Sequence, residues 1–76
     1  MPSSPTLTEI VAETIRQEMA AKNVSGAKLA LAIGKSDMYV SRRLRGETAF
    51  DMHDIELIAA ELGVPVSRFV KVGGAK

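Results

Sequence analysis

The chain has 76 residues, of which 46% are hydrophobic and 25% are charged, and its formal net charge is +1. A chain of this length forms one small domain and leaves no room for a separate catalytic domain. It contains no cysteine, which excludes disulfide bonds and thiolate metal sites and fits a reducing cytoplasm. No apolar run approaches the roughly 20 residues that cross a bilayer, and no signal-peptide pattern is present, so we expect no membrane association.

The first helix signal follows a short polar lead. Residues 1–5 are rich in Ser and Pro and are predicted to be flexible. Thr6 and Glu9 then form the pattern of a capping box, which satisfies two backbone donors at a helix start. The apolar positions that follow recur every three or four residues, which predicts a helix over residues 7–22 with one face in the core.

Two short helices are predicted next, each begun by a serine cap and ended by a glycine. They cover residues 26–33 and 37–45, with caps at Ser25 and Ser36 and stops at Gly34 and Gly46. A fourth helix is predicted from the cap Asp51 to the stop Gly63, and a short last turn begins at Pro65. No segment shows the alternation of a strand. The prediction is an all-α, compact five-helix bundle over residues 6–70, with a flexible tail over residues 71–76.

The charges are unevenly distributed along the chain. Residues 22–46 contain six basic side chains and one acidic one, whereas residues 47–63 contain five acidic side chains and no Lys or Arg. A protein with a nearly neutral total can therefore present one strongly positive face, which is what binding to a polyanion requires.

The two short helices and the turn between them, residues 34–36, have the spacing of a helix-turn-helix. Apolar residues give the pair an underside that faces a core: Leu29, Ile33, Val40 and Leu44. The other side of the second helix is polar and lacks an apolar stripe, so it is suited to a polar partner. The sequence therefore predicts that residues 36–45 form the helix that reads the major groove of DNA.

The pattern LxxxxGKSDxxVSRRLRG, followed by IxxIAxELGVPV, resembles the phage repressor and Cro family of helix-turn-helix regulators, the XRE type. The resemblance covers residues 10–70 and depends on the joint spacing of Leu29, Ala30, Gly34, Ser36, Val40, Ser41, Gly46, Ile58, Ala59 and the Leu62-Gly63-Val64 segment. It implies a lambda-repressor-like bundle and binding to a DNA operator in the cytoplasm, usually as a dimer. Two positions depart from the family: Gly26, where many members have Gln, and Leu44, where many have Glu.

The resemblance also implies the roles of individual residues. Asp37, Met38 and Arg42 are expected at base edges, flanked by Tyr39 and Arg43. Arg bonds guanine most often and Asp accepts from cytosine, so these two residues favour half-sites that contain G·C pairs. Met can only contact the thymine methyl group. The expected phosphate contacts are Ser25, Lys28, Lys35, Ser36, Arg45 and the backbone amides of Thr48 and Ala49.

Each of these roles has a structural alternative. Arg42 and Arg43 could pair with acidic residues of the fourth helix, Met38 and Tyr39 could pack against the helix over residues 26–33, and Asp37 could serve only the helix dipole. His53 lacks the second imidazole or thiol that a zinc site needs. Ser41 has no catalytic context, so an enzyme is the least supported class, and no cofactor or small-molecule ligand is expected. An antitoxin-like protein-interaction module is the alternative function.

Apolar residues after the reading helix predict self-association. Phe50, Phe69, Val70 and Val72 are predicted to be exposed, because the core does not obviously need them, and we expect some of them to form a weak dimer contact, mainly on DNA. The alternative for Phe69 is that it closes the core beneath the fourth helix.

Overall fold

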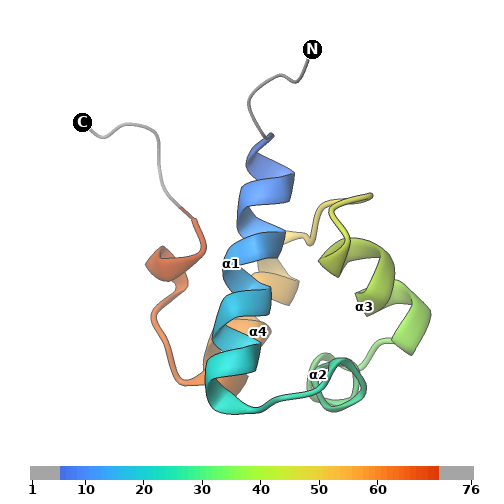
Figure 1. The fold of residues 1–76 in the computed structure, drawn as a ribbon. Helices are drawn as coiled ribbons and strands as arrows, with labels where there is room; N and C mark the ends of the chain where they lie inside the picture. Colours follow the sequence, from blue (N-terminus) through green and yellow to red (C-terminus); the bar gives the residue numbers. More distant parts are fainter. Residues whose placement is uncertain (1–5, 71–76) are drawn as a thin grey trace.

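The structure is a computed structural model, and it describes residues 6–70. Four α-helices follow one another: α1 (Leu7–Lys22), α2 (Gly26–Ile33), α3 (Asp37–Leu44) and α4 (Met52–Leu62). A short 3-10 turn, η1 (Val66–Arg68), comes last (Figure 1). Over residues 6–70 there is no strand, which confirms the all-α prediction. The predicted flexible segments, residues 1–5 and 71–76, lie outside the described residues.

Local capping determines where the helices begin. The Thr6 hydroxyl accepts a hydrogen bond from the Glu9 amide at 3.1 Å, while the Glu9 carboxylate accepts one from the Thr6 amide at 2.9 Å. The side chains of Ser25, Ser36 and Asp51 each accept one hydrogen bond from a backbone amide three residues on and cap the next three helices. Each cap satisfies a backbone donor that a helix start would otherwise leave without a partner.

Two elements differ from the prediction. Helix α3 ends at Leu44 and Arg45 is its C-cap, one residue earlier than expected. The predicted fifth helix is only the turn η1, so the fold has four α-helices and a 3-10 turn rather than five helices. Its amides at Arg68 and Phe69 bond to carbonyls three residues back, because the segment after Pro65 is too short to build a helical ladder.

The core lies where α1, α2 and α4 meet the inner side of α3. Its largest fully buried side chains include Ile15, Leu29, Ile58 and Phe69. A Leu or Ile side chain buried to this extent contributes about 1.5–3 kcal/mol of transfer free energy, so these residues dominate the stability of so small a domain.

The prediction that Phe50 and Phe69 are exposed is wrong, because they are only 8% and 2% exposed. Phe69 closes the core beneath α4, as the alternative proposed, because η1 turns it inward. Val70 is half-buried, and Val72 lies outside the described residues.

Helix α3 is held from its inner side. It packs against α2 and α1 (Figure 1), and Val40 on its inner side is buried. The Arg16 guanidinium of α1 donates a hydrogen bond to the carbonyl oxygen of Leu44, at the C-terminal end of α3. The outer side of α3 is therefore fixed in orientation and left at the surface. No helix within residues 6–70 combines the length and apolar character that crossing a membrane requires.

Candidate nucleic-acid interface

The outer side of α3 forms an exposed polar surface with a shallow hollow. Asp37 and Arg42 are exposed there, and the Met38 side chain is 69% exposed, which argues against its packing on α2. These three residues line the hollow together with Ser41, Arg45 and Glu47. The structure thus brings three of the five expected base-reading residues together on one face.

Tyr39 and Arg43 lie elsewhere, half-buried within the domain. The Tyr39 hydroxyl donates a hydrogen bond to the Asp54 carboxylate of α4, and this bond raises the pKa of Tyr39, so the hydroxyl stays protonated. The Arg43 guanidinium carbon lies 3.5 Å from the centroid of the Tyr39 ring, and Arg43 Nη1 donates to the Tyr39 carbonyl at 3.2 Å. Both side chains are therefore engaged in intramolecular contacts, and Tyr39 reaches α4 rather than packing only on α2.

Asp54 also belongs to this region, although its contact with Tyr39 was not predicted from the sequence. It is only 1% exposed and is the buried acidic residue to which Tyr39 bonds. Its position carried a signal, because it lies four residues before Ile58 and eight before Leu62, on the helical stripe that faces the core. A carboxylate on such a stripe must find a hydrogen-bond donor when it is buried.

The expected phosphate-binding residues lie mostly at exposed positions near the starts of α2 and α3. Ser25, Lys28, Lys35 and Ser36 are exposed, as is Arg45 after the end of α3. Ser25 and Ser36 accept hydrogen bonds from their own helices, so their hydroxyl protons are free to donate. Thr48 differs, because it is half-buried and lines an apolar cavity.

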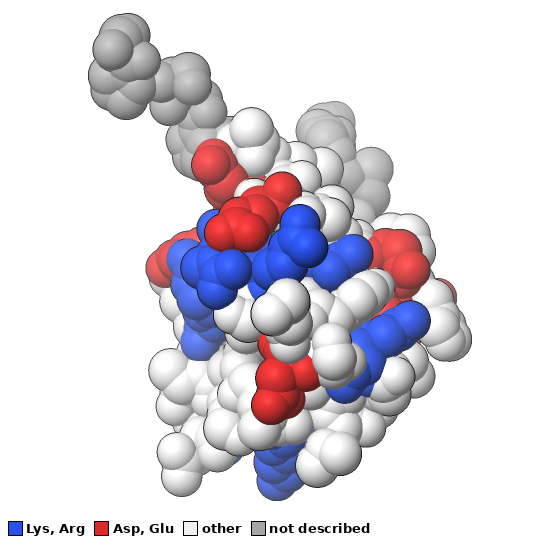
Figure 2. Space-filling view, turned by 90° about the vertical axis from the view of Figure 1, so that its right-hand side faces the viewer, with Lys and Arg blue, Asp and Glu red and all other residues white. Residues whose placement is uncertain are grey.

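Figure 2 views the molecule from the side of α2 and α3 and shows a band of Lys and Arg side chains bordered by acidic ones. The uneven charge of the sequence therefore becomes a positive band in space. The helix starts at Ser25 and Ser36 add the positive ends of two helix dipoles. Such an arrangement of cations and free backbone amides suits phosphate groups.

Arg42 and Arg45 share one carboxylate partner, Glu47. Arg45 Nε donates to Glu47 Oε2 at 2.8 Å, and Arg42 Nε lies 3.8 Å from Glu47 Oε1. Arg42 therefore pairs with Glu47 in the loop after α3. The alternative that Arg42 pairs with an acidic residue of α4 is wrong. The hydrogen bond from Arg45 lowers the pKa of the Glu47 carboxyl, so this group is charged at neutral pH.

His53 is an exposed residue, and its Nδ1 lies 3.9 Å from Glu56 Oε1. Within the described part of the chain, no group of three or more His, Asp or Glu residues could hold a metal ion.

Comparisons with known proteins agree with this geometry. A family profile described as helix-turn-helix matches residues 15–69. The crystal structure of the restriction-modification controller protein C.AhdI from Aeromonas hydrophila superposes with a TM-score of 0.76, at 22% identity, over 83% of this chain and 96% of that one. No curated protein matches the chain in sequence. The family profile spans more than half of the chain and confirms the resemblance to XRE-type regulators. The chain belongs to the helix-turn-helix family and is a DNA-binding transcriptional regulator of that type.

Proposed function

We propose that the protein binds a specific double-stranded DNA operator in the cytoplasm, as a repressor or Cro-like regulator, with the outer face of α3 in the major groove. One observation carries the proposal: Asp37, Met38 and Arg42 project from a helix whose inner side is anchored in the core. A rigid helix with exposed polar groups can present them to base edges in a fixed register. Arg42 is the main reader, because an Arg guanidinium forms two bonds to guanine.

The remaining expected contacts are divided between phosphate binding and support of α3. We assign Lys28, Lys35 and Arg45, with the caps Ser25 and Ser36 and the amides of Thr48 and Ala49, to phosphate groups. Tyr39 and Arg43, which we expected beside the base edges, are assigned to holding α3 in place, because both are half-buried and the Tyr39 hydroxyl and Arg43 Nη1 bond within the domain. Lys35 Nζ lies 5.0 Å from the Tyr39 ring centroid, so a proposed phosphate-binding residue also contacts a residue that supports α3.

Binding to DNA is expected to weaken steeply as salt rises, because the cations of the positive band must displace counterions condensed on several phosphates. The measurement is fluorescence anisotropy of a labelled duplex from the flanks of the protein's own gene, between about 50 and 200 mM salt. The logarithm of the association constant should fall linearly with the logarithm of the salt concentration. An affinity that stays constant over this range would contradict binding through the positive band.

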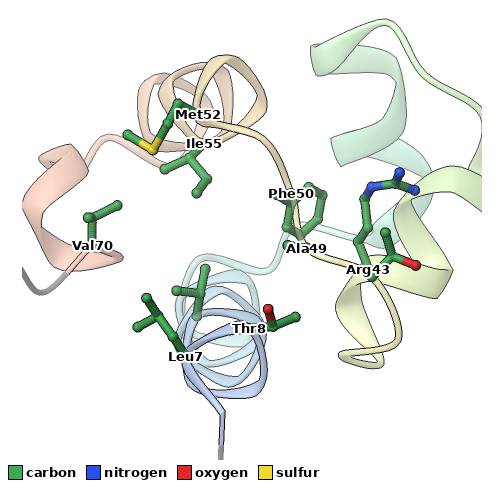
Figure 3. A pocket seen from close by; sticks show the side chains of 10 residues that line it. Leu7, Thr8, Arg43, Ala49, Phe50, Met52, Ile55 and Val70 are labelled. Atoms are coloured by element: carbon green, nitrogen blue, oxygen red, sulfur yellow. The ribbon is translucent and has the colours of Figure 1, made fainter.

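An apolar surface near the starts of α1 and α4 supports dimer formation on the operator. The exposed side chains Leu7 and Met52, 58% and 55% exposed, border a cavity of about 180 Å³ that Val70 also lines (Figure 3). We propose that this surface, through its exposed residues Leu7 and Met52, forms a weak two-fold contact. Phe50 lines the same cavity but is buried, and Phe69 belongs to the core. Such a contact would place two reading helices about one DNA turn apart.

Met52→Glu is expected to abolish the complex that contains two protomers on a palindromic duplex and to leave the one-protomer complex intact, because a carboxylate in an apolar contact loses its hydration. The matched control is His53→Glu, which adds the same charge one residue along the chain, outside the cavity lining. Sedimentation of the protein–DNA complexes distinguishes the two states. Equal dimer formation by both variants would argue against this surface.

A further inference from the structure

Glu47 is held over the outer face of α3 by its backbone. Its amide donates a hydrogen bond to the Arg42 carbonyl at 3.1 Å. The turn before it depends on Gly46, which has a φ of +82°, in the left-handed region that favours glycine. A Cβ atom at Gly46 would also lie 3.3 Å from the Glu9 side chain. The turn therefore returns Glu47 to the reading face in a defined position.

The Glu47 carboxylate faces the Nε atoms of two arginines, Arg45 within hydrogen-bond distance and Arg42 farther away. It lies against Nε of Arg45 and near Nε of Arg42, and Arg45 Nη1 also donates to the Ser41 hydroxyl at 2.7 Å. The contact with Arg42 is made at Nε, so Nη1 and Nη2 stay available for a two-bond contact with a guanine edge. This ion pair, with 3.8 Å between Nε and Oε1, attracts the Arg42 side chain toward Glu47 and leaves Nη1 and Nη2 without a contact to this carboxylate.

The stability of the domain does not explain this arrangement. The Arg42, Arg45 and Glu47 side chains are 55%, 57% and 50% exposed, and ion pairs this exposed contribute little to folding. A negative charge beside the reading helix also repels DNA phosphates. The Glu47 charge therefore weakens binding to DNA in general. Its position is explained if it favours one DNA sequence over others.

We propose that Glu47 is a specificity-determining positioning residue: it holds Arg42 ready for guanine and penalises complexes in which no base contact compensates for phosphate repulsion. The proposal rests on Arg42 being the base reader. It predicts that removing the charge strengthens binding to unrelated DNA more than binding to the preferred sequence. Specificity would then fall although affinity rises.

The test compares the parent protein, Glu47→Gln and a matched control, Glu61→Gln, which removes the same charge from an exposed position near the end of α4. Each protein selects from a randomised duplex library, and its affinity is then measured for the parent's selected duplex and for a scrambled duplex. For Glu47→Gln we expect about fivefold tighter binding to the scrambled duplex, the size of one unscreened charge contact in water, and a similar loss of discrimination. The base pair read by Arg42 should be less strongly selected, and Glu61→Gln should behave as the parent does.

Two results would overturn the inference while leaving DNA reading by α3 intact. In one, Glu47→Gln selects the same sequence with undiminished discrimination. In the other, it tightens binding to both duplexes by the same factor, which would make Glu47 a repelling charge without a positioning role. If the parent binds duplexes without selecting any sequence, the proposed operator recognition itself fails, and the inference fails with it. Melting curves of all three proteins should coincide.

Discussion

Tyr39→Phe is expected to lower the free energy of unfolding by about 2 kcal/mol, which corresponds to a fall in melting temperature of roughly 10 °C for a domain of this size. The change removes only the hydroxyl that donates to the buried Asp54 carboxylate. The ring that packs beneath the Arg43 guanidinium remains. A buried acceptor that loses its donor keeps the full cost of its lost hydration, and this cost is larger for a charged group.

A double variant separates the missing bond from any loss of packing. In Tyr39→Phe with Asp54→Leu, both polar partners are replaced by apolar groups, so most of the lost stability should return. Asp51, which caps α4, is unchanged in that variant. Thermal unfolding followed by circular dichroism measures all three proteins. If Tyr39→Phe melts at the parent's temperature, the bond does not stabilise the position of α3 on α4.

The helix boundaries could be predicted because they depend on neighbours in the sequence. The capping box at Thr6 and Glu9 joins residues three positions apart. The glycine stops at Gly34 and Gly63 likewise bond only to the last turn of their own helices. The predicted end of α3 is one residue too late, because the glycine signal marks the turn and not the last helical residue. Gly46 does adopt a positive φ, but Arg45 before it already lies outside the helix as the C-cap.

The supporting contacts of the site depend on pairs that are distant or weakly encoded. Tyr39 and Asp54 are fifteen residues apart, and only the packing of the helices shows that they meet. Phe50 follows a loop, so its burial depends on the path of that loop rather than on a helical period. The exposed positions of Asp37, Met38 and Arg42, by contrast, follow from the period of one short helix. The sequence therefore indicates the proposed reading face and leaves its support undetermined.

Arg42→Ala is expected to reduce affinity for the preferred operator by about 1–3 kcal/mol and to relax the preference at one base pair in each half-site. The reason is that the change removes the guanidinium proposed to bond guanine. The melting temperature should barely change, because the Arg42 side chain is 55% exposed and its pairing with Glu47 is a weak surface contact. Selection from a randomised duplex library, followed by affinity measurements on single-base variants of the selected site, gives both quantities.

Arg68→Ala is the matched control for the lost positive charge. Arg68 pairs with Glu18 and belongs to η1, not to the reading helix. Its removal should leave the base preference of the protein unchanged. Lys28→Ala, at a proposed phosphate contact, should instead weaken binding to all duplexes alike and lower the salt dependence by about one unit of slope. If Arg42→Ala melts several degrees lower and still discriminates between operator and scrambled DNA as the parent does, Arg42 is a structural residue and another side chain of the outer face of α3 reads the sequence.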